Sequence, residues 1–180
     1  MKKVNRIIII RTILSILLVI MFLVTFGFSS QDSNKSSNIS KKTTEMLVKN
    51  NKKVQSLDEK ERIQVIGELE TVIRKIAHFS LYTVIGILLI LLNLTFDINL
   101  KRKIIQSILI GIIYAIIDEF HQMFSPGRSA EFRDVLIDTS GVLCGIVLGI
   151  VLTKIGSKIL GKTIKKQTSD RKCIGEHENE

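Results

Sequence analysis

Four long apolar runs constrain the fold of this 180-residue chain more than any other feature of the sequence. They lie at about Ile7–Phe28, Ile76–Phe96, Ile104–Phe124 and Val135–Ile155. About 20 predominantly apolar residues form a helix long enough to cross the roughly 30 Å hydrocarbon core of a bilayer. Because the bilayer core offers no water to backbone groups, spanning segments of this kind must be helical. The sequence therefore predicts an all-α polytopic membrane protein with a bundle of four transmembrane helices.

The apolar runs divide the chain into four parts. We expect a transmembrane anchor at 1–28, an extracytoplasmic loop at 29–75, a three-helix transmembrane core at 76–155, and a basic, then polar, cytoplasmic tail at 156–180. The first run of about 22 residues exceeds the roughly 7–15 apolar residues of a signal peptide, so we expect an uncleaved anchor. Arg11 lies inside this run, where its stem can snorkel toward the basic N-terminus.

The second half of the 29–75 loop carries a helical pattern of its own. Ser56 and Glu59 fit the S-x-x-E capping box of a helix N-terminus. Apolar residues then recur at spacings of three and four, the period of one helix face, at Ile63, Ile66, Leu69, Ile73 and Ile76. This predicts an amphipathic extracytoplasmic helix that runs into the second span. Two arrangements are open: a lid on the outer leaflet, or a solvated helix packed on the bundle.

Basic residues lie where they decide the orientation of the spans. They precede the first span, fill the short connection at 101–103 and follow the last span. In the long loop at 29–75 they are interleaved with acidic residues. Because short loops and charges near the spans determine topology, we expect both termini to be cytoplasmic, in a multi-pass protein of the cell membrane.

This distribution also explains the formal net charge of +9. Lysine and arginine near a membrane surface are attracted to anionic lipid head groups. Nucleic-acid binding would instead need a basic face on a soluble module. We therefore expect membrane lipids as partners and no nucleic acid.

Polar residues concentrate at three span ends that must meet at one face of the membrane, because consecutive spans alternate in direction. An ionisable group in hydrocarbon costs roughly 2.5–3.5 kcal/mol on insertion scales, so such residues need partners or a cavity. The cluster comprises Lys75, His78 and Tyr82 at the start of the second span, Asp118, Glu119, His121 and Gln122 at the end of the third, and Asp134 and Asp138 at the start of the fourth. With cytoplasmic termini, this cluster is an outward-facing polar site.

The fourth span shows how its carboxylates are oriented. Gly141 and Gly145 continue the helix face that carries Asp138. Small residues spaced by four let helices approach closely, so we expect this face to point into the bundle. The Pro-Gly pair before the span predicts a tight turn that presents Arg128 beside the carboxylates. Glu119 is expected at the rim of the site.

At these residues the chain resembles the VanZ-like family, membrane proteins named for an accessory determinant of resistance to the glycopeptide teicoplanin. The resemblance covers about residues 28–149, in the family's order and with its four-span layout. It implies a role in the cell envelope or in susceptibility to lipophilic glycopeptides. The matching stretches are Phe28–Gln31, Arg74–Phe79 with Tyr82 and Gly86, Asp118–Gln122, Phe124–Glu131, and Asp134–Thr139 with Gly141 and Gly145.

Three interpretations of the polar site are open, and the first is recognition. Arg128, Lys75 and Arg133 would engage an anionic group such as a lipid phosphate, which arginine can hold bidentately. Because teicoplanin carries an acyl chain, the expected ligand is a lipid-linked cell-wall precursor or a lipoglycopeptide. The ligand-binding set would be Lys75, His78, Tyr82, Asp118, Glu119, Gln122, Arg128, Asp134 and Asp138.

The second interpretation is an intramembrane enzyme that acts on an envelope lipid or glycan. Its general base and orienting carboxylate, or a divalent-metal site, would come from four candidates: His78, Asp118, His121 and Asp134. The sequence has no H-E-x-x-H or G-x-S-x-G motif and no cysteine nucleophile at this face. This favours recognition over catalysis, and we expect neither a cofactor nor a bound metal.

The third interpretation is a structural network that fixes the register of the helices, with function exerted through a partner. Lys75 would pair with Asp134 or Asp138, and His78 with Asp118. The members of each pair would neutralise or hydrogen-bond each other, so that no external ligand is needed.

Overall fold

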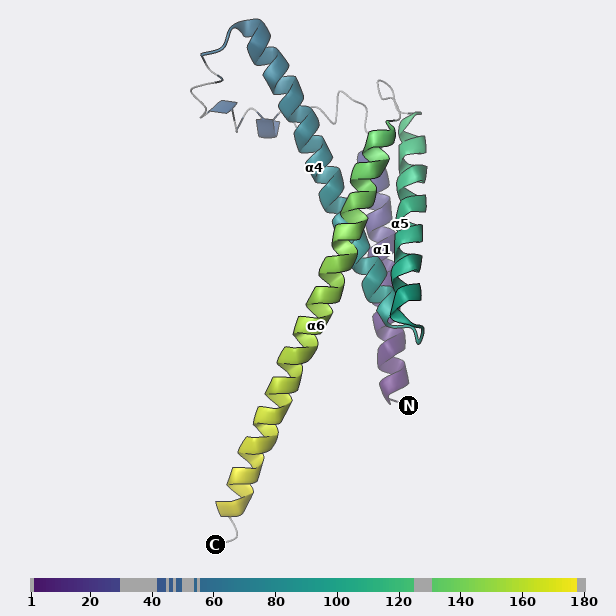
Figure 1. The fold of residues 1–180 in the computed structure, drawn as a ribbon, viewed down its shortest axis with the longest axis vertical. Helices are drawn as coiled ribbons and strands as arrows, with labels where there is room; N and C mark the ends of the chain where they lie inside the picture. Colours follow the sequence, from purple (N-terminus) through teal and green to yellow (C-terminus); the bar gives the residue numbers. More distant parts are fainter. Residues whose placement is uncertain are drawn as a thin grey trace.

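The computed structural model describes residues 2–29, 42–44, 46, 48–49, 54, 56–124 and 131–177 of the chain. Within these residues it contains four long helices and no strand (Figure 1). The helices are α1 (Lys2–Ser29), α4 (Glu59–Leu94), α5 (Leu100–Gln122) and α6 (Phe132–His177). Each is long and apolar enough to cross a membrane, which confirms the predicted all-α membrane bundle.

The helices alternate in direction through the bundle (Figure 1). α5 ends where α6 begins, and the membrane-spanning part of α4 starts at the same end. We call this the polar end of the bundle. The start of α1 and the end of α6 lie beyond the opposite end (Figure 1). α6 is also longer than its predicted span, because the helix continues through most of the expected tail to His177.

α4 joins the predicted amphipathic segment and the second span in one unbroken helix of 36 residues. At 1.5 Å per residue it is about 54 Å long, well beyond the thickness of a bilayer core. Its N-cap is Asp58, whose carboxylate accepts a hydrogen bond from the Glu59 N–H at 2.9 Å, so the predicted cap at Ser56 is wrong. The amphipathic part projects past α5 and α6 (Figure 1), with Ile63 64% exposed. It extends the span instead of covering the polar end as a lid.

Glycines allow α4 and α6 to form the most extensive helix contact in the bundle. A Cβ atom at Gly141 would lie 2.6 Å from the carbonyl oxygen of Phe79, and one at Gly145 would overlap the carbonyl oxygen of Thr83. On α4, a Cβ at Gly86 would overlap the backbone of α6 in the same way. Small residues at a spacing of four therefore bring the two backbones together, as the sequence predicted for Gly141 and Gly145.

Below the polar end, the interior of the bundle is mainly apolar. Its fully buried side chains include Ile85, Leu89 and Ile90 of α4, with Val142 of α6 packed among them. Large apolar side chains also remain exposed along all four helices. Lipid is the natural solvent for such a surface, whereas a soluble protein rarely exposes so much of it.

Arg11 attaches α1 to the end of α4 that lies opposite the polar end. Its Nε donates a hydrogen bond to Thr95 Oγ1 at 3.0 Å, and its Nη2 donates to the Thr95 carbonyl oxygen at 2.6 Å. The guanidinium also lies 4.2 Å from the ring centroid of Phe96. Thr95 is the C-cap of α4, where unpaired carbonyls and the helix dipole favour a cation. Arg11 thus has specific partners, where the sequence predicted only snorkelling.

The α4–α6 contact can be tested at Gly145. Gly145→Ala should lower the free energy of unfolding by about 1–3 kcal/mol, because the added methyl group meets backbone atoms that cannot rotate away. Gly156→Ala, in the same helix but with no atom within 4 Å of the new Cβ, is the matched control. Thermal unfolding of both variants in detergent measures the difference. Equal stability of the two would contradict this account of the packing.

Candidate functional site

Side chains from all four helices meet at the polar end. Ser29 ends α1, Tyr82 lies on α4, Asp118 on α5 and Asp138 on α6, and all four are fully buried. The convergence follows from the alternating helix directions and from the close approach of α4 and α6. The structure thus brings together residues that lie up to 109 positions apart in the sequence, from Ser29 to Asp138.

Asp118 lies at the centre of a hydrogen-bond network that joins three helices. Its Oδ2 accepts from Ser29 Oγ at 2.7 Å and from the Tyr82 hydroxyl at 3.1 Å. Gln122 Nε2 in turn donates to Ser29 Oγ at 3.1 Å. Hydrogen bonds to a buried charged group contribute roughly 1.5–3 kcal/mol, so this network fixes α1 against α4 and α5.

Ser29 is a member of the site that residue-type reasoning did not select. A single serine at the end of an apolar run carries no helical period and no charge. The signal that could have found it was the Phe28–Gln31 stretch, which carries part of the family resemblance. Its role depends on the packing of α1, which places its hydroxyl against Asp118.

His78 faces Asp138, not Asp118 as the network interpretation expected. Its Nδ1 lies 3.6 Å from Asp138 Oδ1, which is longer than a hydrogen bond. The physical reason is the close contact at Gly141, one turn further along α6, which brings Asp138 against α4. If the site has a general base with an orienting carboxylate, His78 is therefore the base and Asp138 is the carboxylate.

Lys75 forms the ion pair that the sequence suggested with Asp134. The Lys75 Nζ lies 3.2 Å from Asp134 Oδ1 and 3.8 Å from Glu131 Oε2. These side chains are partly exposed, so solvent and head groups screen the pair and it adds little stability. Its main consequence is geometric, because it holds the start of α6 against α4.

Glu119 is buried, although the sequence placed it at the rim. Its Oε1 accepts a hydrogen bond from the backbone N–H of Glu131 at 2.6 Å. This contact binds the end of α5 to the residue that precedes α6. Glu119 therefore links the end of α5 to the start of α6 through a buried hydrogen bond.

His121 lies on the α1 side of the polar end. Its ring centroid is 3.9 Å from that of Phe26. Nearby, the Tyr114 hydroxyl donates to the carbonyl oxygen of Phe22 at 2.7 Å, and the two rings stack at 4.1 Å. These contacts pack α1 onto α5, with the ring of His121 against α1.

A small pocket opens at the polar end between α4, α5 and α6. It encloses about 260 Å³ of unfilled space, part of it open to the surroundings. Its lining combines two cations, two carboxylates, an imidazole, an amide and one apolar side chain, namely Arg74, Lys75, His78, Gln122, Asp134, Ile137 and Asp138. Arg128 and the turn at 125–130 lie outside the described residues.

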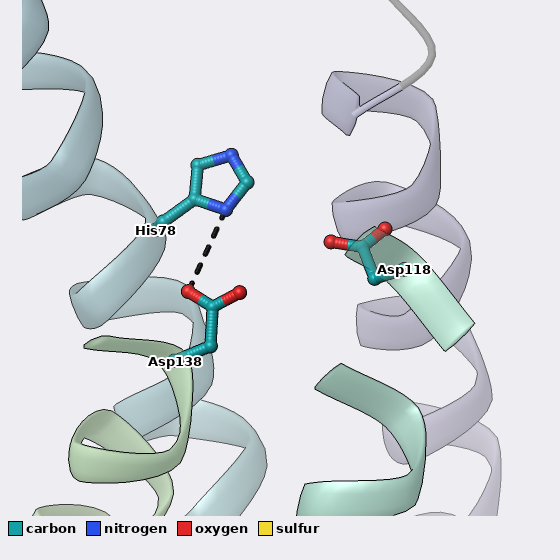
Figure 2. Close-up of side chains that lie close together, drawn as sticks. All are labelled: His78, Asp118 and Asp138. Carbon is teal, nitrogen blue, oxygen red and sulfur yellow. Dashed lines mark ion pairs between the residues drawn. The ribbon is translucent and has the colours of Figure 1, made fainter. Parts of the chain in front are cut away.

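Three groups at the polar end have the composition of a cation site, and two of them, His78 and Asp138, line this pocket. His78, Asp118 and Asp138 each offer one ligand atom, and these atoms lie within 4.8 Å of one another. In Figure 2 they project from three different helices toward a shared space. The remaining carboxylates bind other groups, since Asp134 pairs with Lys75 and Glu119 with the backbone.

The fold and the site together define a four-span membrane protein with a buried polar cluster at one end of its bundle. A family model described as VanZ/LLP1 matches residues 14–153, well over half of the chain. The chain belongs to this family. The matched region contains every described residue of the site, from Ser29 to Asp138. Comparison with curated proteins and with solved structures gave no match.

The Asp118 network can be tested with a double-mutant cycle. Ser29→Ala and Tyr82→Phe should each lower the free energy of unfolding by roughly 1.5–3 kcal/mol, because each removes a hydrogen bond to a buried carboxylate. Since both hydroxyls donate to one oxygen, their effects should deviate from additivity by at least about 0.5 kcal/mol. Unfolding in detergent provides the readout.

The control cycle combines Ser29→Ala with Ser107→Ala. Ser107 accepts from Asn93 at the other end of the bundle, so the two effects should add within about 0.5 kcal/mol. Additivity in both cycles would show that Ser29 and Tyr82 do not share a network.

Proposed function

We propose that the polar end binds the head group of an amphiphilic molecule of the cell envelope, and that this binding modulates envelope properties or susceptibility to lipophilic glycopeptides such as teicoplanin. The observation that carries the proposal is the pocket between α4, α5 and α6. This pocket is lined by Arg74 and Lys75 together with His78 and Asp138 at one end of the bundle.

The lining of the pocket suits a head group that bears both anionic and hydrogen-bonding groups. Arg74 can hold a phosphate or carboxylate bidentately, and Arg128 would add a second guanidinium. Gln122 and Asp138 offer donor and acceptor atoms to hydroxyl, amide or amine groups. A lipid-linked cell-wall precursor or a lipoglycopeptide carries this combination of groups.

Exposed apolar side chains of α4 and α6 near the polar end suit the chain of such a molecule. Ile76, Phe132 and Leu136 lie near the polar end and are 59%, 76% and 53% exposed. A head group bound in the pocket would leave its acyl chain alongside these residues within the bilayer. The head group would therefore reach the pocket from the bilayer while the acyl chain stays in the bilayer.

The proposal places the pocket on the outer side of the cell membrane, with both termini in the cytoplasm. The support is the first turn of α5, which carries Lys101, Arg102 and Lys103 next to the short α4–α5 connection, opposite the polar end. Short basic connections stay on the cytoplasmic side. An outward pocket faces the compartment in which glycopeptides and their targets meet.

Reporter fusions test this orientation. A fluorescent protein fused after Glu180 should fluoresce, and alkaline phosphatase fused at that position should be inactive, because the C-terminus is cytoplasmic. Alkaline phosphatase fused after Phe124, at the polar end, should be active. The reverse pattern would contradict an outward-facing site.

Antibiotic susceptibility tests the function. A susceptible Gram-positive host that expresses the wild type should tolerate at least fourfold more teicoplanin, with a smaller effect on vancomycin. Asp118→Asn and Arg128→Ala should abolish this protection, because they remove a central carboxylate and a cation of the site. The minimum inhibitory concentrations are compared at equal membrane levels of the protein.

Matched controls make the same chemical changes at the opposite end of the bundle. Asp97→Asn, in the α4–α5 connection, and Arg102→Ala, in the first turn of α5, alter exposed residues and should keep full protection. Absence of protection by a well-expressed wild type would refute the glycopeptide role. Loss of the Asp118 and Arg128 variants from the membrane would instead favour a structural network.

A further inference from the structure

Asp118 and Asp138 are buried carboxylates that the fold leaves incompletely satisfied. Among the described residues, Asp118 Oδ1 and both oxygens of Asp138 have no hydrogen-bond partner. We propose that these two carboxylates and His78 form a binding site for one divalent transition-metal ion, such as Zn²⁺ or Mn²⁺. This inference goes beyond the proposed function, because metal binding does not require an envelope ligand.

The geometry allows a single ion to reach all three groups. Three atoms within 4.8 Å of one another share a point that is at most about 2.8 Å from each. Zinc lies about 2.0–2.2 Å from nitrogen and carboxylate ligands. Side-chain rotations that move each ligand atom by less than about 1 Å would close this difference. Figure 2 shows the imidazole and the two carboxylates around this space.

The electrostatic balance favours a cation at this position. Three of the four oxygens of these buried carboxylates accept no hydrogen bond among the described residues, which is costly unless a positive group compensates them. Lys75, on the same helix as His78, already pairs with Asp134 and Glu131. A divalent ion would supply two positive charges where Asp118 and Asp138 face each other, and His78 would bind it through a neutral ring nitrogen.

Asp118 has the hydrogen bonds that orient a metal-binding carboxylate. Its Oδ2 accepts hydrogen bonds from Ser29 and Tyr82, which leaves Oδ1 for the ion. Carboxylates that bind metals are commonly oriented by hydrogen bonds of this kind. The Asp118 network therefore acts as the support of the site, and its three helices hold the ligand rigidly.

The donor set indicates which metals fit. One imidazole with two carboxylates suits Zn²⁺, Mn²⁺ or Fe²⁺, whereas Mg²⁺ and Ca²⁺ favour oxygen alone. Three protein ligands leave at least one coordination position for water or a ligand oxygen. Because His78 and Asp138 also line the pocket, this position would face the bound head group. The proposal replaces the sequence-based expectation that no metal is bound.

Metal binding by the full chain, purified in detergent without a polyhistidine tag, tests the proposal. After chelation and removal of the chelator, the protein is incubated with Zn²⁺ or Mn²⁺ and desalted, and its metal content is measured by mass spectrometry. The wild type should retain about one ion per chain, and the ion should raise its unfolding temperature. Asp138→Asn and His78→Ala should bind at least tenfold more weakly and lose this shift.

Control variants test whether metal binding depends specifically on the three proposed ligands. His121→Ala removes the histidine that packs on Phe26, and Asp97→Asn changes an exposed carboxylate; both should bind metal as the wild type does. Asp138→Glu keeps the donor type and should restore binding in part, which a purely structural role of Asp138 would not predict. Circular dichroism confirms that each variant is folded.

Two results would overturn the metal site. One is a folded wild type that binds neither ion. In that case Asp118 and Asp138 would share a proton instead of a metal ion. The other is stoichiometric binding that persists in both Asp138→Asn and His78→Ala. Because no antibiotic is present in this test, failure of the metal site is distinguishable from failure of the glycopeptide role. Protection without metal binding refutes the metal site alone. Metal binding without protection refutes the glycopeptide role alone.

Discussion

The close packing of α4 on α6 is the constraint on which the rest of the structure depends. Glycines let the two backbones approach until a single added methyl group would overlap a carbonyl oxygen. One turn from this contact, Asp138 faces His78, and one further turn away Asp134 reaches Lys75. Since helices in lipid gain little from apolar burial alone, such backbone approach is a main source of their association. The position of every ionisable pair between these helices follows from it.

A second constraint is the free-energy cost of placing ionisable side chains in the membrane. The protein lowers this cost in two ways. Near the surface, Lys75 and Asp134 are partly exposed and neutralise each other. Deeper in the bundle, Asp118 binds hydroxyl donors from α1 and α4, while Asp138 has a histidine nearby and no hydrogen bond among the described residues. A purely structural network would satisfy its innermost carboxylates first, so the inner pair is where a bound ion or ligand has most to contribute.

The sequence predicted the number and class of the helices because apolar runs near 20 residues have one stable form in a bilayer. It also predicted which span ends meet, through alternating direction. It misplaced the N-cap of α4, which is Asp58, and it paired His78 with Asp118 instead of Asp138. It placed Glu119 at the rim, although Glu119 is buried against the backbone of Glu131. The errors at His78 and Glu119 concern contacts between neighbouring helices, which depend on how each helix is rotated and not on residue spacing along it.

What the sequence determined by itself is the membrane bundle, the polar end and the membership of the VanZ/LLP1 family, because hydropathy and motif order are local properties of the chain. Only the tertiary structure decided that Ser29 and Tyr82 share Asp118, and that His78, Asp118 and Asp138 surround one space. Those contacts join residues on four helices, and their geometry depends on crossing angles and on the depth of packing at glycines. Neither quantity can be read from the order of residues along a single helix.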